Sequence, residues 1–427
     1  MGYFVNYNNL IIIDTPEPDD IGGKPPAVSL LTFDFAGSKS IAAIVFVMMF
    51  VWATSLSAQQ KPVARIPIGY INQQIERPPD LSNLEETPED EGFAGGRISI
   101  LDNNTTGQFL GQKFELVEVD VAVGADPLAA FNGLVDQGVQ FIVANVPADT
   151  LLQLSDAAKD RDVLFFNAGA PDNRLRDEDC RANVMHIGPS RAMYTDALAQ
   201  FLVRKKWRDW FLITGPRDGD GLFAESMKQS ARKFGGKIVA DRIWDFGPDA
   251  RRTAQAEVPA FTQGVDHDVI VVADELGVFG EYIMYRTWEP RPVVGTQGLR
   301  PTTWHKTHEQ WGSAQLQSRF KKRFKRPMTA IDYLVWAPIR AIGEGATRTH
   351  SADFDKIVSY IKSPNFELAG FKGLPLTFRD WNWQLRQPIL LVQPAAVVSR
   401  SPQEGFLHRR SLLDTMGSDK QESKCKF

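Results

Sequence analysis

The sequence predicts an α/β protein of two lobes, each built on a doubly wound parallel sheet. Short runs such as residues 141–146 and 163–166 are apolar on both faces, which is typical of parallel strands that helices cover on each side. Helical patterns alternate with such runs, with short joints between them. The chain has 427 residues, of which 43% are hydrophobic. It is therefore too long for one ordinary core, and two packed units are expected.

The first unit follows from the order of its patterns. A buried strand is predicted at residues 64–71, and the acidic, proline-rich stretch 78–91 interrupts the pattern after it. Helices and strands then alternate. The predicted helices are 93–106, 127–138 and 150–162, and the predicted strands are 112–123, 139–146 and 163–170.

The same alternation restarts after residue 190 and predicts a second unit of similar design. Its helices are expected at 191–206, at 223–234 and near Gln255, and its strands at 209–215, 237–243 and 268–274. The final third adds strands at 291–299 and 387–394 and helices at 315–325, 331–346 and 353–361. The last thirty or so residues are polar and irregular, and we expect an extended tail there.

An apolar segment near the start, residues 41–58, predicts export. It follows Lys39 and ends in small residues, so it fits a signal peptide cleaved after Ala58. An uncleaved membrane anchor with the same exported body is the alternative interpretation. Residues 1–38 are too acidic for the leading region of a signal peptide, and we expect the true translation start to lie downstream of Met1.

Charge and motifs argue against several classes of function. The formal net charge is -4 and the isoelectric point is about 6.0, so no basic surface for nucleic acid is expected. No phosphate-binding loop, dinucleotide fingerprint or nucleophile elbow occurs, so we expect neither an enzyme nor a cofactor. His305 and His308 lack a nearby third ligand, and no metal site is expected.

Two further features have both a functional and a structural interpretation. The basic run 319–327 fits either a docking patch or, as we favour, the solvated face of a helix whose Phe320 and Phe324 point inward. Trp304, Trp381 and Trp383 fit either the lining of a cleft or, more commonly, core packing.

The residues at the strand ends are the candidate ligand site. In open α/β sheets, ligands gather outside the carboxyl ends of the strands, where loops and helix N-termini converge. For each residue, ligand contact and a turn or cap role are both open. The predicted ligand-binding residues are Asn72, Gln73, Val146, Pro147, Asn167, Ala168, Gly169, Ala170, Arg217, Asp274, Glu275 and Gln297.

The chain has two cysteines, Cys180 and Cys425. Because disulfides persist in exported proteins, one bridge that ties the tail to the body is expected about as strongly as two free thiols.

Two long stretches resemble type I periplasmic binding proteins, typified by the branched-chain amino-acid receptors of ABC importers. Residues 92–116 (GFAGGRISILDNNTTGQFLGQKFEL) are similar to that family's helix, turn and strand, and residues 140–176 to its paired strand-end loops. The resemblance implies two lobes joined by three crossovers, which close like a hinge on a small-molecule ligand. It also implies delivery of that ligand to an ABC permease in the inner membrane.

A narrower resemblance lies in the C-terminal half. Residues 295–305, 371–394 and 404–427 are similar to a subfamily of binding proteins associated with alcohol oxidation that depends on pyrroloquinoline quinone. This resemblance implies a small polar solute linked to that oxidation. The rival hypothesis is a periplasmic sensory or interaction protein that keeps the fold without transport.

The resemblance also implies a division of the chain and a departure at the ligand site. Residues 1–58 are expected to be the upstream segment and signal peptide. Residues 62–187 and 324–370 are expected to form one lobe, and residues 188–323 and 371–395 the other. Residues 396–427 are expected to form a C-terminal tail. The amino-acid receptors place Ser or Thr where this chain has Val146 to Ala148 and Ala168 to Ala170, and an acid where it has Gln297. Binding of an ordinary amino acid is therefore not expected.

Overall fold

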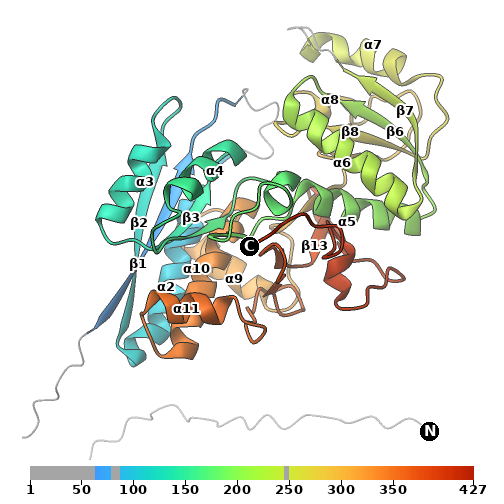
Figure 1. The fold of residues 1–427 in the computed structure, drawn as a ribbon. Helices are drawn as coiled ribbons and strands as arrows, with labels where there is room; N and C mark the ends of the chain where they lie inside the picture. Colours follow the sequence, from blue (N-terminus) through green and yellow to red (C-terminus); the bar gives the residue numbers. More distant parts are fainter. Residues whose placement is uncertain (1–62, 78–86, 245–249) are drawn as a thin grey trace, which may run out of the picture. The chain divides into compact units, whose positions relative to one another are not determined.

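A computed structural model describes residues 63–77, 87–244 and 250–427 of the chain (Figure 1). The predicted signal segment lies outside these residues. The first lobe contains a five-stranded, all-parallel sheet in the order β2-β1-β3-β4-β5. Its strands are β1 (Ala64–Gln73), β2 (Gln112–Val121), β3 (Phe141–Asn145), β4 (Leu164–Asn167) and β5 (Val184–His186).

Helices cover both faces of this sheet because alternate residues of each strand point to opposite sides. Ile66, Ile68 and Tyr70 of β1 pack in one core with α2 (Phe93–Leu110), α10 (Ala330–Thr349) and α11 (Phe354–Ile361). Ile71 of β1 and Ile142 of β3 belong to the core on the other face, with α3 (Pro127–Asp136) and α4 (Ala148–Ala157). The first lobe is therefore a doubly wound sheet, with helices on both of its faces.

Local sequence signals fix the helices of the first lobe. Asp126 caps α3 by accepting a hydrogen bond from the Leu128 N–H, with Pro127 at the first helical position. Thr329 and Asp332 form a capping box at the start of α10. The close approach of α2 to α10 requires Gly95, because a Cβ there would lie 2.1 Å from the Asp332 carbonyl oxygen.

The second lobe repeats the design with a four-stranded parallel sheet in the order β7-β6-β8-β9. Its strands are β6 (Asp209–Thr214), β7 (Lys237–Ile243), β8 (Val269–Ala273) and β9 (Val293–Gly295). Trp210 and Leu212 pack with α5 (Arg191–Arg204) and α6 (Asp218–Phe234). Phe211 and Ile213 pack toward α7 (Ala250–Thr262) and α8 (Gly280–Ile283) on the other face.

Three connections, at residues 187–190, 303–312 and 362–388, join elements that pack in the core of the first sheet to elements that pack in the core of the second, and we call them the passages between the lobes. An antiparallel sheet of β10 (Arg300–Thr302), β13 (Ile389–Gln393) and β14 (Ala396–Ser401) packs beside α5. The third passage carries a hairpin of β11 (Thr377–Phe378) and β12 (Leu385–Arg386). The predicted α/β fold class with parallel sheets is confirmed.

The C-terminal segment differs from the irregular tail that the sequence predicted. Residues 396–401 form β14, which pairs with β13, and the one-turn helix Leu412–Thr415 follows. Leu413 and Met416 are buried in the core of the second lobe. The prediction of an irregular tail failed because a polar composition does not reveal a short strand such as β14. It also does not reveal that two isolated apolar side chains, Leu413 and Met416, enter a core. The division of the chain between lobes stays a prediction.

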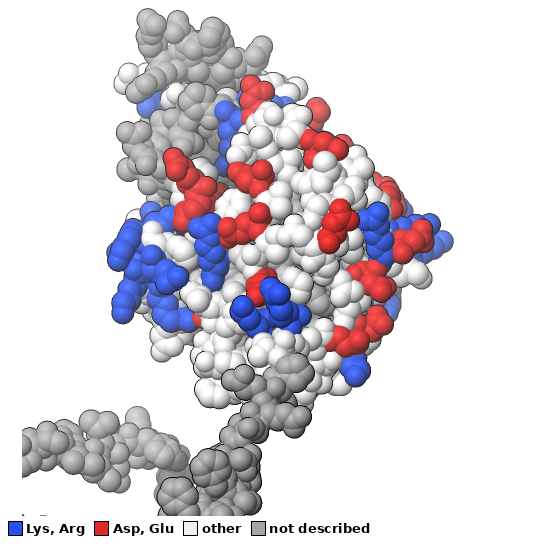
Figure 2. Space-filling model, turned by 90° about the vertical axis from the view of Figure 1, so that its left-hand side faces the viewer, with Lys and Arg blue, Asp and Glu red and all other residues white. Residues whose placement is uncertain are grey.

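The basic helix α9 (Ser313–Phe324) has the solvated face that the sequence favoured. Phe320 is fully buried in the first-lobe core and Phe324 packs on it, whereas Lys321, Lys322 and Arg323 are exposed. On the face drawn in Figure 2, acidic and basic side chains are both present, and Lys and Arg gather at its left edge. Within the described ranges, no helix is long and apolar enough to cross a membrane.

Candidate ligand-binding site

A cavity of about 690 Å³ lies at the carboxyl ends of β1 to β4 in the first lobe. The loops that follow these strands form most of its wall, and the start of α2 and the segment before it close one side. The second lobe contributes Arg191, Gly219 and Leu222. We call this space the strand-end cavity.

A chain of amide and carboxylate side chains crosses the floor of the cavity. Asn72 of β1 stands in register with Asp120 on β2 and with Asn145 on β3, so the parallel pairing itself aligns the three side chains. Asn145 Nδ2 donates to Asn72 Oδ1 at 2.8 Å, and Asn72 Nδ2 donates to Asp120 Oδ1 at 2.7 Å. Gln74 Nε2 donates to the second Asp120 oxygen at 2.6 Å. The network presents a carboxylate and amide groups to the cavity.

The loop after β4 is held from beneath by buried polar groups. Asn167 is fully buried; its Nδ2 donates to the Ala170 carbonyl at 2.8 Å and its Oδ1 accepts from the Ala170 N–H at 2.9 Å. Asn167 Nδ2 also lies 3.1 Å from His186 Nδ1. Burial, together with the nearby Arg176 guanidinium, holds the pKa of His186 well below its usual range. A neutral His186 therefore accepts from Asn167 and fixes the loop.

Arg176 connects this loop to two passages between the lobes. Its guanidinium donates to the Ala170 and Asp172 carbonyls at 2.8 and 3.0 Å, to the Gly188 carbonyl at 2.8 Å, and to Gln384 Oε1 at 2.9 Å. Burial lowers the pKa of Arg176 to about 9. Because these acceptors belong to the cavity loop, residues 187–190 and residues 362–388, Arg176 positions the cavity relative to the hinge.

Two of the three cationic side chains at the cavity wall, Arg174 and Arg191, are paired, and the third, Arg77, is exposed. Arg191 makes a bidentate contact with Glu275, at 2.8 and 2.7 Å, and lies 3.1 Å from Asp172. Arg174 contacts Asp149 and, at 2.7 Å, Asp179. Glu89, Glu91 and Asp120 also line the cavity, and burial raises the pKa of Glu91. The lining thus has more acidic than free basic groups.

A sequence profile of the periplasmic binding protein family matches residues 94–396. The chain belongs to the periplasmic binding protein family. A search of curated proteins found no match.

Solved structures share the fold of this binding protein. A periplasmic binding protein from Burkholderia mallei is 15% identical, with a TM-score of 0.62, over 84% of this chain and 98% of that one. A branched-chain amino-acid ABC transporter ligand-binding protein from Burkholderia xenovorans is 17% identical, with a TM-score of 0.63, over 78% and 95%. A solute-binding protein from Rhodopseudomonas palustris, solved with 3,4-dihydroxybenzoic acid, is 15% identical, with a TM-score of 0.56, over 77% and 92%.

The predicted site residues of this binding protein fall into three groups. Those that line the strand-end cavity are Asn72, Gln73, Val146, Pro147, Gly169 and Ala170. Asn167 and Ala168 are buried beneath it. The second-lobe residues Arg217, Asp274, Glu275 and Gln297 do not line it.

Each second-lobe residue has another structural role. Asp274 is 1% exposed, and its carboxylate accepts from the N–H groups of residues 278, 279 and 280 at 2.9, 2.8 and 2.6 Å. Glu275 pairs with Arg191. Arg217 is exposed and precedes α6, and Gln297 packs against Gly280. The strand-end rule identified residues that follow strands of the second sheet, but it could not tell a cap from a ligand contact.

Sequence reasoning missed Asp120, Asn145 and Arg191. Asp120 is the second-last residue of the alternating strand β2, and Asn145 directly precedes the predicted Val146, so the strand-end rule applied to every strand would have found both. Arg191 is the first residue of α5, and no local signal connects it with Glu275, 84 residues away. Trp304, Trp381 and Trp383 lie outside the cavity lining, and Trp304 stacks on Tyr333 in the core.

Proposed function

We propose that this chain is the solute-binding component of an ABC importer, which takes up a small polar compound in the periplasm and delivers it to a permease in the inner membrane. One observation carries the proposal: the aligned network of Asn72, Asp120 and Asn145 at the floor of a 690 Å³ cavity that faces the second lobe. A concave site with a few convergent polar groups suits a small ligand. Export by the segment 41–58 is part of the proposal.

The chemistry of the cavity favours a neutral or cationic ligand that donates hydrogen bonds. Its β3 and β4 loops carry Val146, Pro147 and Ala170 and offer no hydroxyl to a carboxylate. Arg191 is occupied by two acidic side chains. An anionic ligand that used Arg191 would have to displace one of these pairs, which costs free energy, and it would also meet the carboxylates of Glu89, Glu91 and Asp120 in the lining. A polyol, an alcohol-derived compound or an amine meets the acceptors of Asp120 without that cost.

The narrower resemblance of the C-terminal half extends this proposal to a solute linked to alcohol oxidation that depends on pyrroloquinoline quinone. The rival proposal, a periplasmic sensory or interaction protein, is favoured by one observation. Glu275 and Asp274 at the second-lobe strand ends are engaged internally, so lobe closure would gain few polar contacts from them.

Calorimetric titration separates these proposals. Leucine, valine and glutamate should bind weakly or not at all, whereas one member of a panel of short alcohols, polyols, aldehydes and amines should bind with a dissociation constant in the micromolar range or below. The variant Asn72→Ala should lose that binding, and the exposed variant Arg217→Ala should keep it. Micromolar binding of leucine would contradict the ligand class, and no binding across the panel or to a metabolite extract would favour the rival.

A further inference from the structure

Residues 411–427, which we call the strap, contact the second lobe at their first half. The Gly417 N–H donates to Asp196 Oδ2 of α5 at 2.8 Å. Lys233 of α6 donates to the Gly417 carbonyl at 2.9 Å and to Asp196 Oδ2 at 2.7 Å. Leu413 and Met416 are buried among the α5 and α6 side chains. The strap is thus anchored on the second lobe by both apolar and charged contacts.

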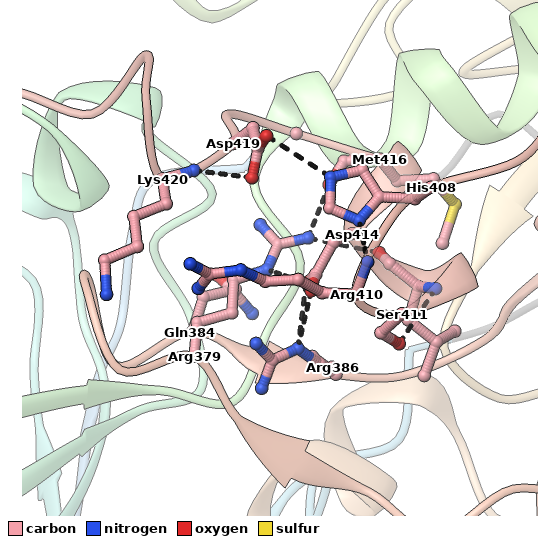
Figure 3. Close-up of polar contacts among 12 residues, drawn as sticks. Arg379, Gln384, Arg386, His408, Arg410, Ser411, Asp414, Met416, Asp419 and Lys420 are labelled. Atoms are coloured by element: carbon pink, nitrogen blue, oxygen red, sulfur yellow. Dashed lines mark hydrogen bonds and ion pairs between the residues drawn. The ribbon is translucent and has the colours of Figure 1, made fainter.

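The strap also forms hydrogen bonds and ion pairs with the third passage between the lobes, residues 362–388 (Figure 3). The side chain of Asp414 is fully buried. Its carboxylate accepts hydrogen bonds from Arg379 Nε at 2.9 Å and from Arg386 Nε at 2.8 Å. Arg379 donates further to the carbonyls of Leu413, at 3.1 Å, and Met416, at 2.6 Å. Both guanidinium groups lie over the Trp381 ring, 5.3 Å (Arg379) and 5.2 Å (Arg386) from its centre. Because Asp414 pairs with two cations at once, this part of the strap resists detachment.

The last residues of the strap attach to the first lobe. Cys425 forms a disulfide with Cys180, which precedes β5, with 5.7 Å between the Cα atoms. Lys424 Nζ lies 3.3 Å from an Asp177 carboxylate oxygen. The strap therefore leaves the second lobe at Gly417 and is covalently joined to the first lobe at Cys425.

We propose that the strap limits how far the two lobes of this binding protein separate, with the Cys180–Cys425 disulfide as its lock. Eight residue-to-residue steps separate Gly417 from Cys425, so this part of the strap, fully extended, spans about 28 Å at most. Wider separation requires release of Asp414 and Gly417 from their buried partners. The proposal concerns the amplitude of hinge motion and does not depend on which ligand binds.

Single-molecule energy transfer between the lobes tests the proposal. Dyes are placed on noncanonical amino acids at Phe109, 82% exposed in the first lobe, and Tyr285, 99% exposed in the second. Both cysteines stay available, and reduction with dithiothreitol affects this disulfide alone because the chain has two cysteines. Reduction and the variant Cys425→Ser should each shift the distribution to longer distances and widen it about twofold.

Two further variants keep the test decisive if Cys425→Ser folds poorly. Insertion of six Gly/Ser residues after Glu422 lengthens the strap with the disulfide intact, and it should widen the distribution as reduction does. Lys426→Ala, an exposed neighbour of Cys425, is the matched control and should leave the distribution unchanged. Identical distributions for the intact, reduced and lengthened strap, at unchanged helical content by circular dichroism, would overturn the proposal.

Discussion

The strand ends of the two lobes differ in what their polar side chains do. In the first lobe, Asn72, Asp120 and Asn145 bond to one another and face the cavity. In the second lobe, Asp274 accepts three backbone N–H groups of its own loop, and Glu275 is engaged by Arg191. Equivalent sheet edges thus serve different purposes. A polar residue at a strand end is available to a ligand only where the adjoining loop and helix satisfy their own backbone.

The largest effect should come from Asp274→Ala. This change leaves two buried N–H groups and one half-buried N–H group without their acceptor, so we expect the free energy of unfolding to fall by about 3 to 5 kcal/mol. Asn72→Ala in the first lobe should cost about 1 kcal/mol or less, because Asp120 is exposed and keeps its bond from Gln74, and Asn145 is half-exposed and can reach solvent. Urea denaturation of both variants measures the difference. Equal losses would mean that the two strand ends do not differ as described.

A smaller effect is expected from Arg191→Met at the boundary of the lobes. It leaves Glu275 and Asp172 facing each other without the cation between them, at a cost of about 2 to 3 kcal/mol. The double variant with Glu275→Gln should recover part of this loss. A double-mutant cycle by urea denaturation measures the coupling. No coupling between Arg191 and Glu275 would show that Glu275 is free to meet a ligand.

The pH dependence of stability should report on the support of the first-lobe loop. Burial depresses the pKa of His186, so between its folded and unfolded pKa values the unfolded chain binds a proton that the folded chain does not. The associated stability is present above pH 6.5 and is lost as pH falls.

From pH 7.5 to 5.5, one such histidine should lower the free energy of unfolding by about 1.4 kcal/mol. His308, whose pKa burial also lowers, acts in the same direction. The variant His186→Asn should flatten this slope, as followed by urea denaturation at several pH values. An unchanged slope in His186→Asn would show that His186 is not the neutral support of Asn167.

The smallest effect is expected from Arg217→Ala and Gln297→Ala, because Arg217 takes part in the cap of α6 through its backbone N–H, which the substitution keeps, and Gln297 only packs against Gly280. Each should change the free energy of unfolding by about 0.5 kcal/mol or less, because substitutions at exposed or half-buried positions without special contacts are nearly neutral. A fall in the free energy of unfolding as large as that of Asp274→Ala would show that Arg217 and Gln297 are needed for the stability of the second lobe.

Much of the fold was predictable because buried parallel strands leave a local signal. Runs such as Phe141–Asn145 and Val269–Ala273 are apolar throughout, and Asp126 with Pro127 marks a helix start. Strand β14 was missed because its side chains are mostly half-exposed and its partner β13 supplies the apolar face.

The candidate site was predictable in position and less so in role. Strand ends are set by the local pattern, and six of the twelve predicted residues line the cavity. Whether Asp274 caps its own loop or meets a ligand depends on where three N–H groups point. The pairing of Arg191 with Glu275 depends on contacts across 84 residues of sequence, which no local pattern encodes.

Mass spectrometry of small molecules released on denaturation tests the central claim most directly, namely that the first-lobe network holds the ligand. Three proteins are compared after incubation with the same metabolite extract: the unaltered chain, the pair Asn72→Ala with Asp120→Ala, and the pair Arg217→Ala with Gln297→Ala. We expect the unaltered chain and the second-lobe pair to release the same compound in similar amounts, and the first-lobe pair to release about tenfold less or below. Release that persists in the first-lobe pair and disappears in the second-lobe pair would contradict the claim.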